Sequence, residues 1–451
     1  MLEVLIAIIV LIGVGYAISK KQNATIVLAV GGLALLFASV ILGHPVLSPE
    51  ETTGLAFLDP FKKVELVFIK NLGNVGLTIM ILFGFSSYMN LIGANEVTVD
   101  LMTRPLNKIK SKYLLIPIIF LLGNLLALVV PSASSLAVLL MATLFPVLTR
   151  VGVSPLAAGA VITTAATIMP TPLGADNILA AETFGMPLMD YVGAHAKISI
   201  PTIFIMAIAH YFWQKYLDKK DSGVVGKIDQ SKVAKLSENL PPKYYAVLPI
   251  LPLILVLFFS LVLDMEVGLV TISIVSLVIA VIVEAIRKRN FVQVSKDINE
   301  FFKGMGNGLA MVVTLLVAAS LLVEGLKALG IVDMIMNSVQ DLNGAGIILV
   351  LAFSGITALI GFISGSGLAV FYASIELLPG LAAGVGVSGA MISLPMQMVA
   401  NLIRSISPVA ACVIIVCSLT GTSPMNIVKR TSVPIITGII SVLLLSILTF
   451  S

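Results

Sequence analysis

An apolar stretch near the C-terminus carries the residues best placed for chemistry. The segment MQMVANLIRSISPVAACVIIV, residues 396–416, is hydrophobic enough to lie in a bilayer, yet it contains Arg404. An arginine inside a membrane costs about 2.5–3.5 kcal/mol on insertion scales, so such a residue usually marks a transport pathway or a charged partner. Pro408 removes a helix hydrogen bond and predicts a break at 405–407. The half-helix after a break points its positive end at the break, which favours an anion there. The polar side chains within one helical turn of this arginine are Asn401, Ser405 and Ser407.

Three other apolar stretches are interrupted in a similar way. The interruptions are PSASS at 131–135, TIMPTPLGADN at 167–177 and SGSG at 364–367. Hydroxyls at such breaks cap the following helix, and the neighbouring backbone N–H groups bind carboxylates. The alternative is that these hydroxyls only cap helices or let them pack closely. We predict a substrate site formed by Arg404, Asn401, Ser405, Ser407, Ser132, Ser134, Ser135, Thr171, Ser364 and Ser366.

Charged residues are scarce near the breaks, and two of them have alternative roles. A planar guanidinium at Arg404 suits a bidentate contact with a substrate carboxylate, but a structural ion pair with Asp176 or Glu376 is the alternative. Asp176 is the only charged residue between Arg150 and Glu182. A carboxylate at this position stabilises a helix N-terminus, and the second role we consider is coupling of transport to protons or sodium.

The composition identifies the class of protein. Of the 451 residues, 58% are hydrophobic and only 11% are charged, whereas a soluble chain has about a quarter charged residues. We therefore expect an all-α polytopic membrane protein. No basic run is dense enough for nucleic acid.

Several patterns of catalysis and cofactor binding are missing from the sequence. The glycines of residues 304–308 lack the Lys-Ser/Thr of a phosphate-binding loop, and no Ser-His-Asp arrangement is evident. The three histidines are scattered, and Cys412 and Cys417 fall on different faces of one helix. We therefore expect no enzyme activity, no metal and no cofactor.

The apolar segments divide into two halves that repeat. Gly73–Asn74 matches Gly306–Asn307, Thr171–Pro172 matches Ser407–Pro408 and Pro201 matches Pro434, each about 233 residues apart. Each half is predicted to hold five membrane spans and one re-entrant hairpin, and an odd number of spans inverts the second copy. The predicted parts are a first repeat at 1–213 (hairpin about 113–149, broken helix about 155–181), a cytoplasmic linker at 214–243, and a second repeat at 244–451 (hairpin about 346–380, broken helix about 389–417).

The distribution of charge predicts the orientation. With both termini outside, the basic groups all fall in the cytoplasm and the acidic loop residues fall outside, which is the positive-inside pattern. The basic groups are Lys20–Lys21, 104–112, Arg150, 214–243, Arg287–Arg289 and Lys429–Arg430, and the acidic residues are Asp59, Asp190, Asp264 and Glu266.

Several strings resemble a known family along the whole chain. They are LLMATLFPVLTRVGVS at 139–154, AHYFWQKYLDKK at 209–220, NLIRSISP at 401–408 and VKRTSVP at 428–434. The sequence resembles the anaerobic four-carbon dicarboxylate carriers of the DcuC type, in the ion transporter superfamily. The resemblance implies a secondary active transporter for succinate and fumarate exchange, or for succinate efflux, across the bacterial inner membrane. It also implies a homodimer that moves both hairpins in an elevator motion. A carrier of another small carboxylate or amino-acid derivative is the alternative, and an anion channel is a weaker one.

Overall fold

The computed structural model describes residues 2–20, 22–109, 111–128, 130, 132–221, 240–265, 267–334 and 345–450. Lys110, Pro131, Glu266 and most of the predicted linker, 222–239, lie outside these residues. Every regular element in the described part is a helix. This all-helical structure, built largely from apolar helices, is that of a polytopic membrane protein.

Before residue 221, the described residues form eleven α-helices. Two short segments have other geometry, a π-helical turn η1 at Leu72–Gly76 and a 3₁₀ turn η2 at Arg104–Lys108. The α-helices are α1 Leu2–Ser19, α2 Ala24–Ile41, α3 Asp59–Asn71, α4 Leu77–Leu91, α5 Ala94–Thr103, α6 Lys112–Leu126, α7 Ala133–Thr143, α8 Phe145–Arg150, α9 Pro155–Thr163, α10 Ala175–Thr183 and α11 Leu188–Lys220.

The second part contains a similar succession of helices. Its irregular turns are the 3₁₀ turns η3 at Lys243–Val247 and η5 at Ile375–Leu377, and a π-helical turn η4 at Leu309–Val313. The α-helices are α12 Leu251–Leu261, α13 Leu269–Lys288, α14 Phe291–Asp297, α15 Asn299–Gly308, α16 Thr314–Ala328, α18 Ala345–Ser364, α19 Gly367–Ser374, α20 Leu378–Gly384, α21 Gly389–Ile403, α22 Ala411–Thr420 and α23 Pro424–Phe450.

Seven helical segments of the described part are long and apolar enough to cross a membrane by themselves. An eighth results if α4 and α5, which meet at a 72° bend, count as one span. Two of the seven, Gly346–Ser364 and Gly367–Gly384, are the arms predicted to form the second re-entrant hairpin. Helix length alone therefore does not distinguish a re-entrant arm from a span in this region. The seven segments are Ala24–Ile41, Leu188–Lys220, Leu269–Lys288, Phe291–Ala328, Gly346–Ser364, Gly367–Gly384 and Pro424–Phe450.

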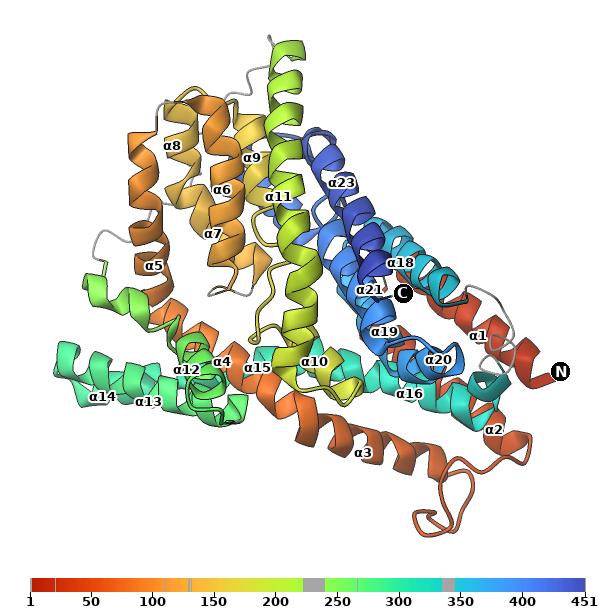
Figure 1. The fold of residues 1–451 in the computed structure, drawn as a ribbon. Coiled ribbons are helices and arrows are strands. Elements are labelled where there is room, and N and C mark those ends of the chain that lie inside the picture. Colours follow the sequence, from red (N-terminus) through yellow and green to blue (C-terminus); the bar gives the residue numbers. More distant parts are fainter. Residues whose placement is uncertain are drawn as a thin grey trace.

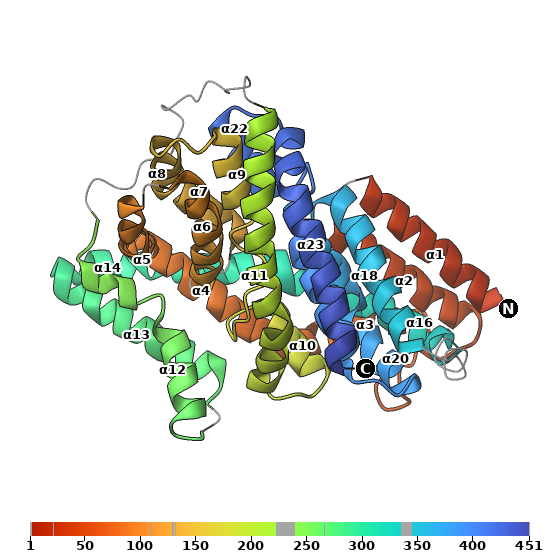
Figure 2. The ribbon, with the colours of Figure 1, turned by 45° about the horizontal axis from the view of Figure 1, so that its top comes forward.

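The centre of the molecule is built around α21. Every residue from Ala390 to Ile403 is buried, as expected for a helix that is apolar all round. The long helices α11 and α23 lie side by side next to it, with α6 to α9 on one flank and α18 on the other (Figures 1 and 2). Helices α3, α4, α15 and α16 cross the lower part of Figure 1. The broken helices therefore lie where these groups of helices meet.

Candidate substrate site

Four helices begin at one cavity of about 540 Å³. Its lining includes the residues at the N-termini of four half-helices, which are α7, α10, α19 and α22. Each helix N-terminus carries unpaired backbone N–H groups and a partial positive charge. The four polar interruptions in the sequence produce these helix starts, so the fold concentrates positive potential in one place. The lining residues at the helix starts are Ser132–Ser135, Gly174–Asn177, Ser366–Ala369 and Ala410–Cys412.

Side chains of the second broken helix bind free backbone carbonyls of the first. Helix α9 ends at Thr163 and α10 begins at Ala175, whereas α21 ends at Ile403 and α22 begins at Ala411. In the second break, Ser405 Oγ donates to the carbonyl of Thr163 at 3.2 Å, and Arg404 Nη2 donates to the carbonyl of Ala166. The second break thus supplies donors to two backbone carbonyls of the first, which reduces the number of unpaired backbone groups there.

Asn124 of α6 fixes the same segment from the other side. Its Oδ1 accepts from the backbone N–H of Thr167 at 3.2 Å and from the Thr167 hydroxyl at 2.9 Å. Its Nδ2 donates to the carbonyl of Phe120 at 2.9 Å. A fully buried amide with all these contacts replaces the helix hydrogen bonds that the break removes.

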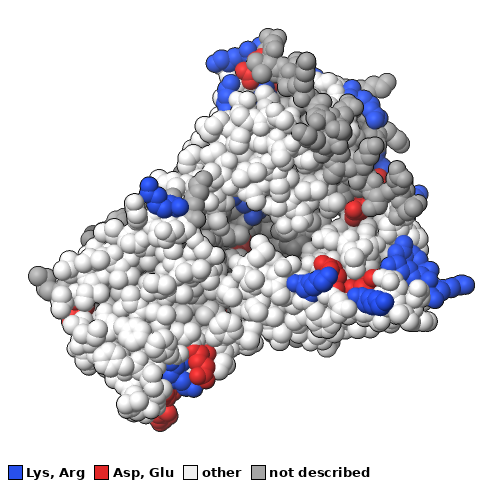
Figure 3. All heavy atoms as spheres, turned by 180° about the vertical axis from the view of Figure 1, so that it is seen from behind, with Lys and Arg blue, Asp and Glu red and all other residues white. Residues whose placement is uncertain are grey.

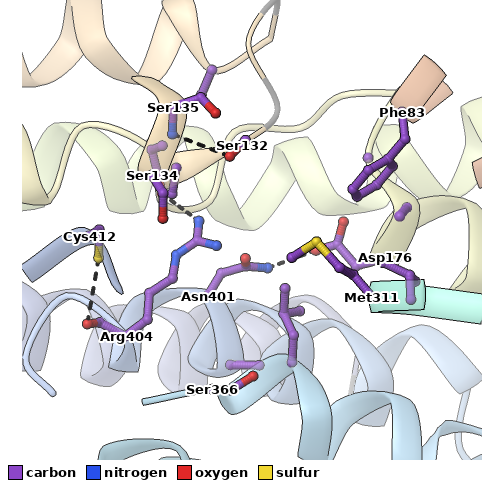
Figure 4. A pocket seen from close by; sticks show the side chains of 18 of the residues that line it. Phe83, Ser132, Ser134, Ser135, Asp176, Met311, Ser366, Asn401, Arg404 and Cys412 are labelled. Carbon is purple, nitrogen blue, oxygen red and sulfur yellow. Dashed lines mark hydrogen bonds between the residues drawn. The ribbon is translucent and has the colours of Figure 1, made fainter. Parts of the chain in front are cut away.

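Arg404 presents a positive charge to this cavity. Its guanidinium points toward the tip of the first predicted hairpin, where Ser132, Ser134 and Ser135 lie (Figure 4). One nitrogen contacts the Ala166 carbonyl, and its Nε is buried without a hydrogen-bond partner. A cation in this state is incompletely compensated, so it favours an anionic ligand.

The predicted structural ion pairs of Arg404 are absent from the described part of the chain. The carboxylate of Asp176 instead accepts from Asn401 Nδ2 at 2.7 Å, and that of Glu376 accepts from the Ser320 hydroxyl. Neither carboxylate lies within 4.0 Å of the guanidinium among the described residues. The structural alternative of an ion pair is therefore not what this geometry shows.

Asp176 lies in the first turn of α10 and lines the cavity. Its Oδ1 accepts from the backbone N–H of Asn177 at 3.1 Å, while its Oδ2 accepts from Asn401. The carboxylate therefore stabilises a helix N-terminus and contacts a predicted substrate-binding amide at the same time. Arg404 and Asp176 are the only Lys, Arg, Asp or Glu residues among the described residues that line the cavity. Figure 3 shows a hollow on the rear face with blue and red atoms within it.

Seven of the ten predicted binding residues line the cavity and three do not. Ser405 and Ser407 are fully buried, and the Ser407 hydroxyl donates to the Phe362 carbonyl at 2.7 Å. Ser364 lines a separate pocket, and its hydroxyl accepts from the backbone N–H of Ser366 at 3.3 Å. The hydroxyls of these three serines contact backbone groups, and such a role was the stated alternative for Ser364 only. The seven lining residues are Arg404, Asn401, Ser132, Ser134, Ser135, Thr171 and Ser366.

A buried polar network behind the cavity was missed at the sequence level. Tyr191 donates to Gln397 Oε1 at 2.7 Å, and Gln397 Nε2 donates to Asn177 Oδ1 at 2.7 Å. Asn177 Nδ2 then donates to the carbonyl of Thr171 at 2.8 Å. The network ties α11 and α21 to the start of α10, beside Asp176. The four-residue spacing of Gln397 and Asn401, which puts both on one face of an apolar helix, was the available signal.

His195 is a further lining residue that its position in the sequence did not suggest. It lies on α11, is 2% exposed, and its Nδ1 lies 3.0 Å from the hydroxyl of Ser199. Its spacing of four residues from Tyr191 places both on the face of α11 that meets the cavity and the network.

Comparisons with known proteins agree on a family. A family model described as "C4-dicarboxylate anaerobic carrier", DcuC, matches residues 2–451. The anaerobic C4-dicarboxylate transporter DcuC of Escherichia coli K12 is 39% identical over 444 residues, covering 98% of this chain and 95% of the relative. A probable transporter of the same name from Vibrio cholerae is 40% identical over 449 residues, covering 98% and 97%.

Two solved structures share the fold at low sequence identity. MtrF of Neisseria gonorrhoeae, described within a class of antimetabolite efflux pumps, matches with a TM-score of 0.66 and 16% identity over 97% of both chains. The YdaH transporter of Alcanivorax borkumensis matches with the same TM-score and identity over 94% of this chain and 97% of its own. At this identity the likeness concerns the fold alone.

Proposed function

The chain belongs to the DcuC family of C4-dicarboxylate anaerobic carriers, and we propose that it carries four-carbon dicarboxylates such as succinate and fumarate across a membrane. The observation that carries this proposal is Arg404, an incompletely paired cation at a cavity lined by four helix N-termini. A dianion needs such compensation when it leaves water, because burying an unpaired charge is costly.

One carboxylate of the substrate, called the near carboxylate below, binds at the guanidinium of Arg404. Nη2 keeps a second N–H besides the one that contacts Ala166, and with Nη1 it forms the edge of the planar guanidinium that can pair with both carboxylate oxygens. The guanidinium points toward the part of the hairpin tip that carries Ser134, whose hydroxyl supplies a further donor (Figure 4). This neutral donor orients the anion, and the arginine supplies the charge.

Two inverted repeats are part of this proposal, and they would bring the breaks of both halves to one place. In the first half, the π-helical turn at 72–76 includes a Gly-Asn pair. In the second half, the π-helical turn at 309–313 closely follows the matching Gly-Asn pair. Both predicted hairpin tips and both broken helices contribute to one cavity. This arrangement supports re-entrant hairpins, and the family resemblance adds an elevator motion in a homodimer of the bacterial inner membrane to the proposal. The distribution of basic and acidic residues supports the orientation with both termini outside.

A labelling experiment tests this orientation. Lys220→Cys and Met265→Cys, each in a Cys412→Ala/Cys417→Ala background, place single exposed thiols at the end of α11 and in the α12–α13 loop. The inverted layout expects an impermeant reagent to label the first only from the cytoplasm and the second only from outside. Labelling of both from the same side would contradict it.

Asp176 is the candidate for coupling transport to protons or sodium. It is the only acidic residue among the described lining residues, and its contact with Asn401 links it to the substrate site. A carboxylate beside a dianion site repels the substrate, so neutralising it with a cation favours substrate binding. Substrate and cation would then bind together, as symport requires.

Counterflow in proteoliposomes tests the function. Labelled succinate should accumulate transiently when unlabelled succinate is inside, and fumarate should compete with it. A cavity of about 540 Å³ is larger than a four-carbon diacid requires, so the panel should include larger carboxylates and amino-acid derivatives. Competition only by those acids would assign another substrate, whereas flux without saturable counterflow would indicate an anion channel.

A further inference from the structure

The cavity wall formed by α4 and α15 is polar but uncharged. Ser86, Ser87 and Asn90 of α4 and Asn307 of α15 all line the cavity. None of them belongs to a predicted hairpin tip or broken helix, so their positions in the sequence did not indicate a role in binding. They nevertheless offer hydroxyl and amide donors, which are the groups that hydrogen-bond a carboxylate.

This wall faces Arg404 across the pocket. In Figure 4, Phe83 of α4 and Met311 of η4 lie on the side away from Arg404, with Asp176 between them. Ser87 lies one helical turn after Phe83, and Asn307 lies one turn before Met311, so each shares a helix face with a residue seen there.

Close helix packing joins the two polar faces. A Cβ atom at Gly304 of α15 would lie 2.7 Å from the Cα of Gly84 of α4, and one at Gly308 would lie 3.1 Å from the Cα of Met80. Only glycines let the two helices approach so closely. The π-helical turn η4 begins directly after Gly308, and such turns occur frequently at functional sites.

The two amides on this wall have unused donors. Asn307 is exposed to the cavity and has no side-chain hydrogen bond among the described residues. Asn90 accepts from Asn95 Nδ2 at 2.5 Å through its Oδ1, which orients its Nδ2 and leaves it free to donate. A preoriented amide loses little freedom when it binds a ligand.

Resting on the proposed transport of diacids, we propose that Asn307, Asn90 and Ser87 bind the far carboxylate of the substrate while Arg404 binds the near one. The cavity has one arginine for two carboxylates, so the second must be hydrogen-bonded by neutral groups. A monocarboxylate has no group for this wall to bind. The wall is therefore the part of the site that distinguishes a diacid from a monoacid of the same length.

The test is the ratio of two affinities in purified protein, those for succinate and for butyrate. Asn307→Ala should weaken succinate binding about tenfold or more and leave butyrate binding unchanged, because a hydrogen bond to a charged group is lost only with the diacid. Asn299→Ala is the matched control, since Asn299 is an exposed residue of the same helix that does not line the cavity. It should change neither affinity.

A change of charge sharpens the test. Asn307→Asp keeps the shape but repels a far carboxylate, so it should abolish succinate binding and increase affinity for β-alanine, which carries an ammonium group there. Wild-type protein that binds no diacid would contradict the proposed function itself. Normal diacid binding in wild type, with an unchanged succinate-to-butyrate ratio in Asn307→Ala or Asn90→Ala, would overturn this inference alone. If the alanine variant of Asn307 does not fold, the ratio in Asn90→Ala decides.

Discussion

Two arginines 26 positions apart illustrate two ways to place a cation inside this protein. Arg430, on α23, is 1% exposed and contacts Asp218 at 2.5 Å and Asp221 at 3.1 Å. Arg404 lies at the wall of a cavity, with one backbone carbonyl as an acceptor and no ion pair among the described residues. The Nε of each arginine is buried without a hydrogen-bond partner, so the difference between them is the carboxylates. One guanidinium is compensated by carboxylates of the protein, and the other is left for an anion from outside.

The surroundings of Arg430 show that it fixes helices. Asp218 also accepts from Ser154, the residue that caps α9, at 2.6 Å. Gln214 donates to the carbonyl of Arg430 at 2.8 Å. The cluster thus joins α9, α11 and α23 at one end of the bundle. A buried cation whose charge is balanced by carboxylates of the protein indicates structure, whereas one at a cavity without such a carboxylate indicates binding.

Loss of Arg430 should have the largest effect. Arg430→Ala leaves Asp218 buried without its cation, which costs about 3–5 kcal/mol. We expect little monodisperse protein after membrane extraction and a strongly lowered melting temperature. Lys429→Ala is the control, because Lys429 is half exposed and its pair with Asp221 is worth at most about 1 kcal/mol.

A second variant sharpens this result. Adding Asp218→Asn to Arg430→Met removes both charges, so part of the lost stability should return. If the Arg430 variants are stable but do not transport, Arg430 acts in function and the contrast between the two arginines fails.

Arg404 should give the opposite pattern, with function lost and stability kept. Arg404→Ala should nearly abolish succinate counterflow, while a monocarboxylate, which needs less compensation, is affected less. Arg404→Lys keeps the charge but loses the bidentate contact, so we expect affinity about tenfold weaker or worse. Melting temperature and counterflow are measured on the same samples. Succinate transport at near-normal affinity in the alanine variant would make Arg404 structural and the site misplaced.

Asp176→Asn tests the acidic partner in the cavity and should have a smaller effect on affinity. If Asp176 carries the coupling proton, the variant should lose the pH dependence of uptake while exchange between bound diacids continues. If Asp176 only stabilises the start of α10, the change should cost about 1 kcal/mol of stability and leave the pH profile intact. Uptake at several pH values, compared with exchange at one pH, separates these results. A normal pH profile in the variant removes Asp176 as the coupling residue.

The sequence was most informative where composition and helix breaks decide the structure. Low charge and long apolar runs predicted an all-helical membrane protein, and the interruptions near Thr171 and Pro408 lie in the observed breaks at 164–174 and 404–410. Which hydroxyl faces a cavity depends on rotation about a helix axis, which a broken helix does not preserve. For that reason Ser405 and Ser407 were expected at the cavity but are buried against backbone.

Buried charges were the least predictable feature. Arg430 was assigned to the cytoplasmic basic groups, because a Lys-Arg pair beside an apolar segment usually lies in a loop. In the structure Arg430 lies within α23, which begins at Pro424, and its side chain points inward toward Asp218. Asp218 lies 212 residues away in sequence, so only the packing of α11 on α23 brings the pair together.

The two native cysteines test the contrast between Arg404 and Arg430 with the smallest expected effect, since the first measurement changes no binding residue. Cys412 lines the cavity near the start of α22, and its Sγ lies 3.9 Å from the carbonyl of Arg404. Cys417 is on the same helix, is also buried, and does not line the cavity. Both thiols should react slowly with a small alkylating reagent, and succinate should slow the reaction at Cys412 alone. At about ten times Kd only about one protein in eleven is unoccupied, so the rate at Cys412 should fall by up to about tenfold.

Mass spectrometry of the two peptides measures each rate within one sample, which makes Cys417 an internal control. In Arg404→Ala the protection should disappear, because the anion no longer binds beside Cys412. Equal protection of both cysteines would point to a change of the whole fold on binding, and no protection at Cys412 would place the succinate away from Arg404.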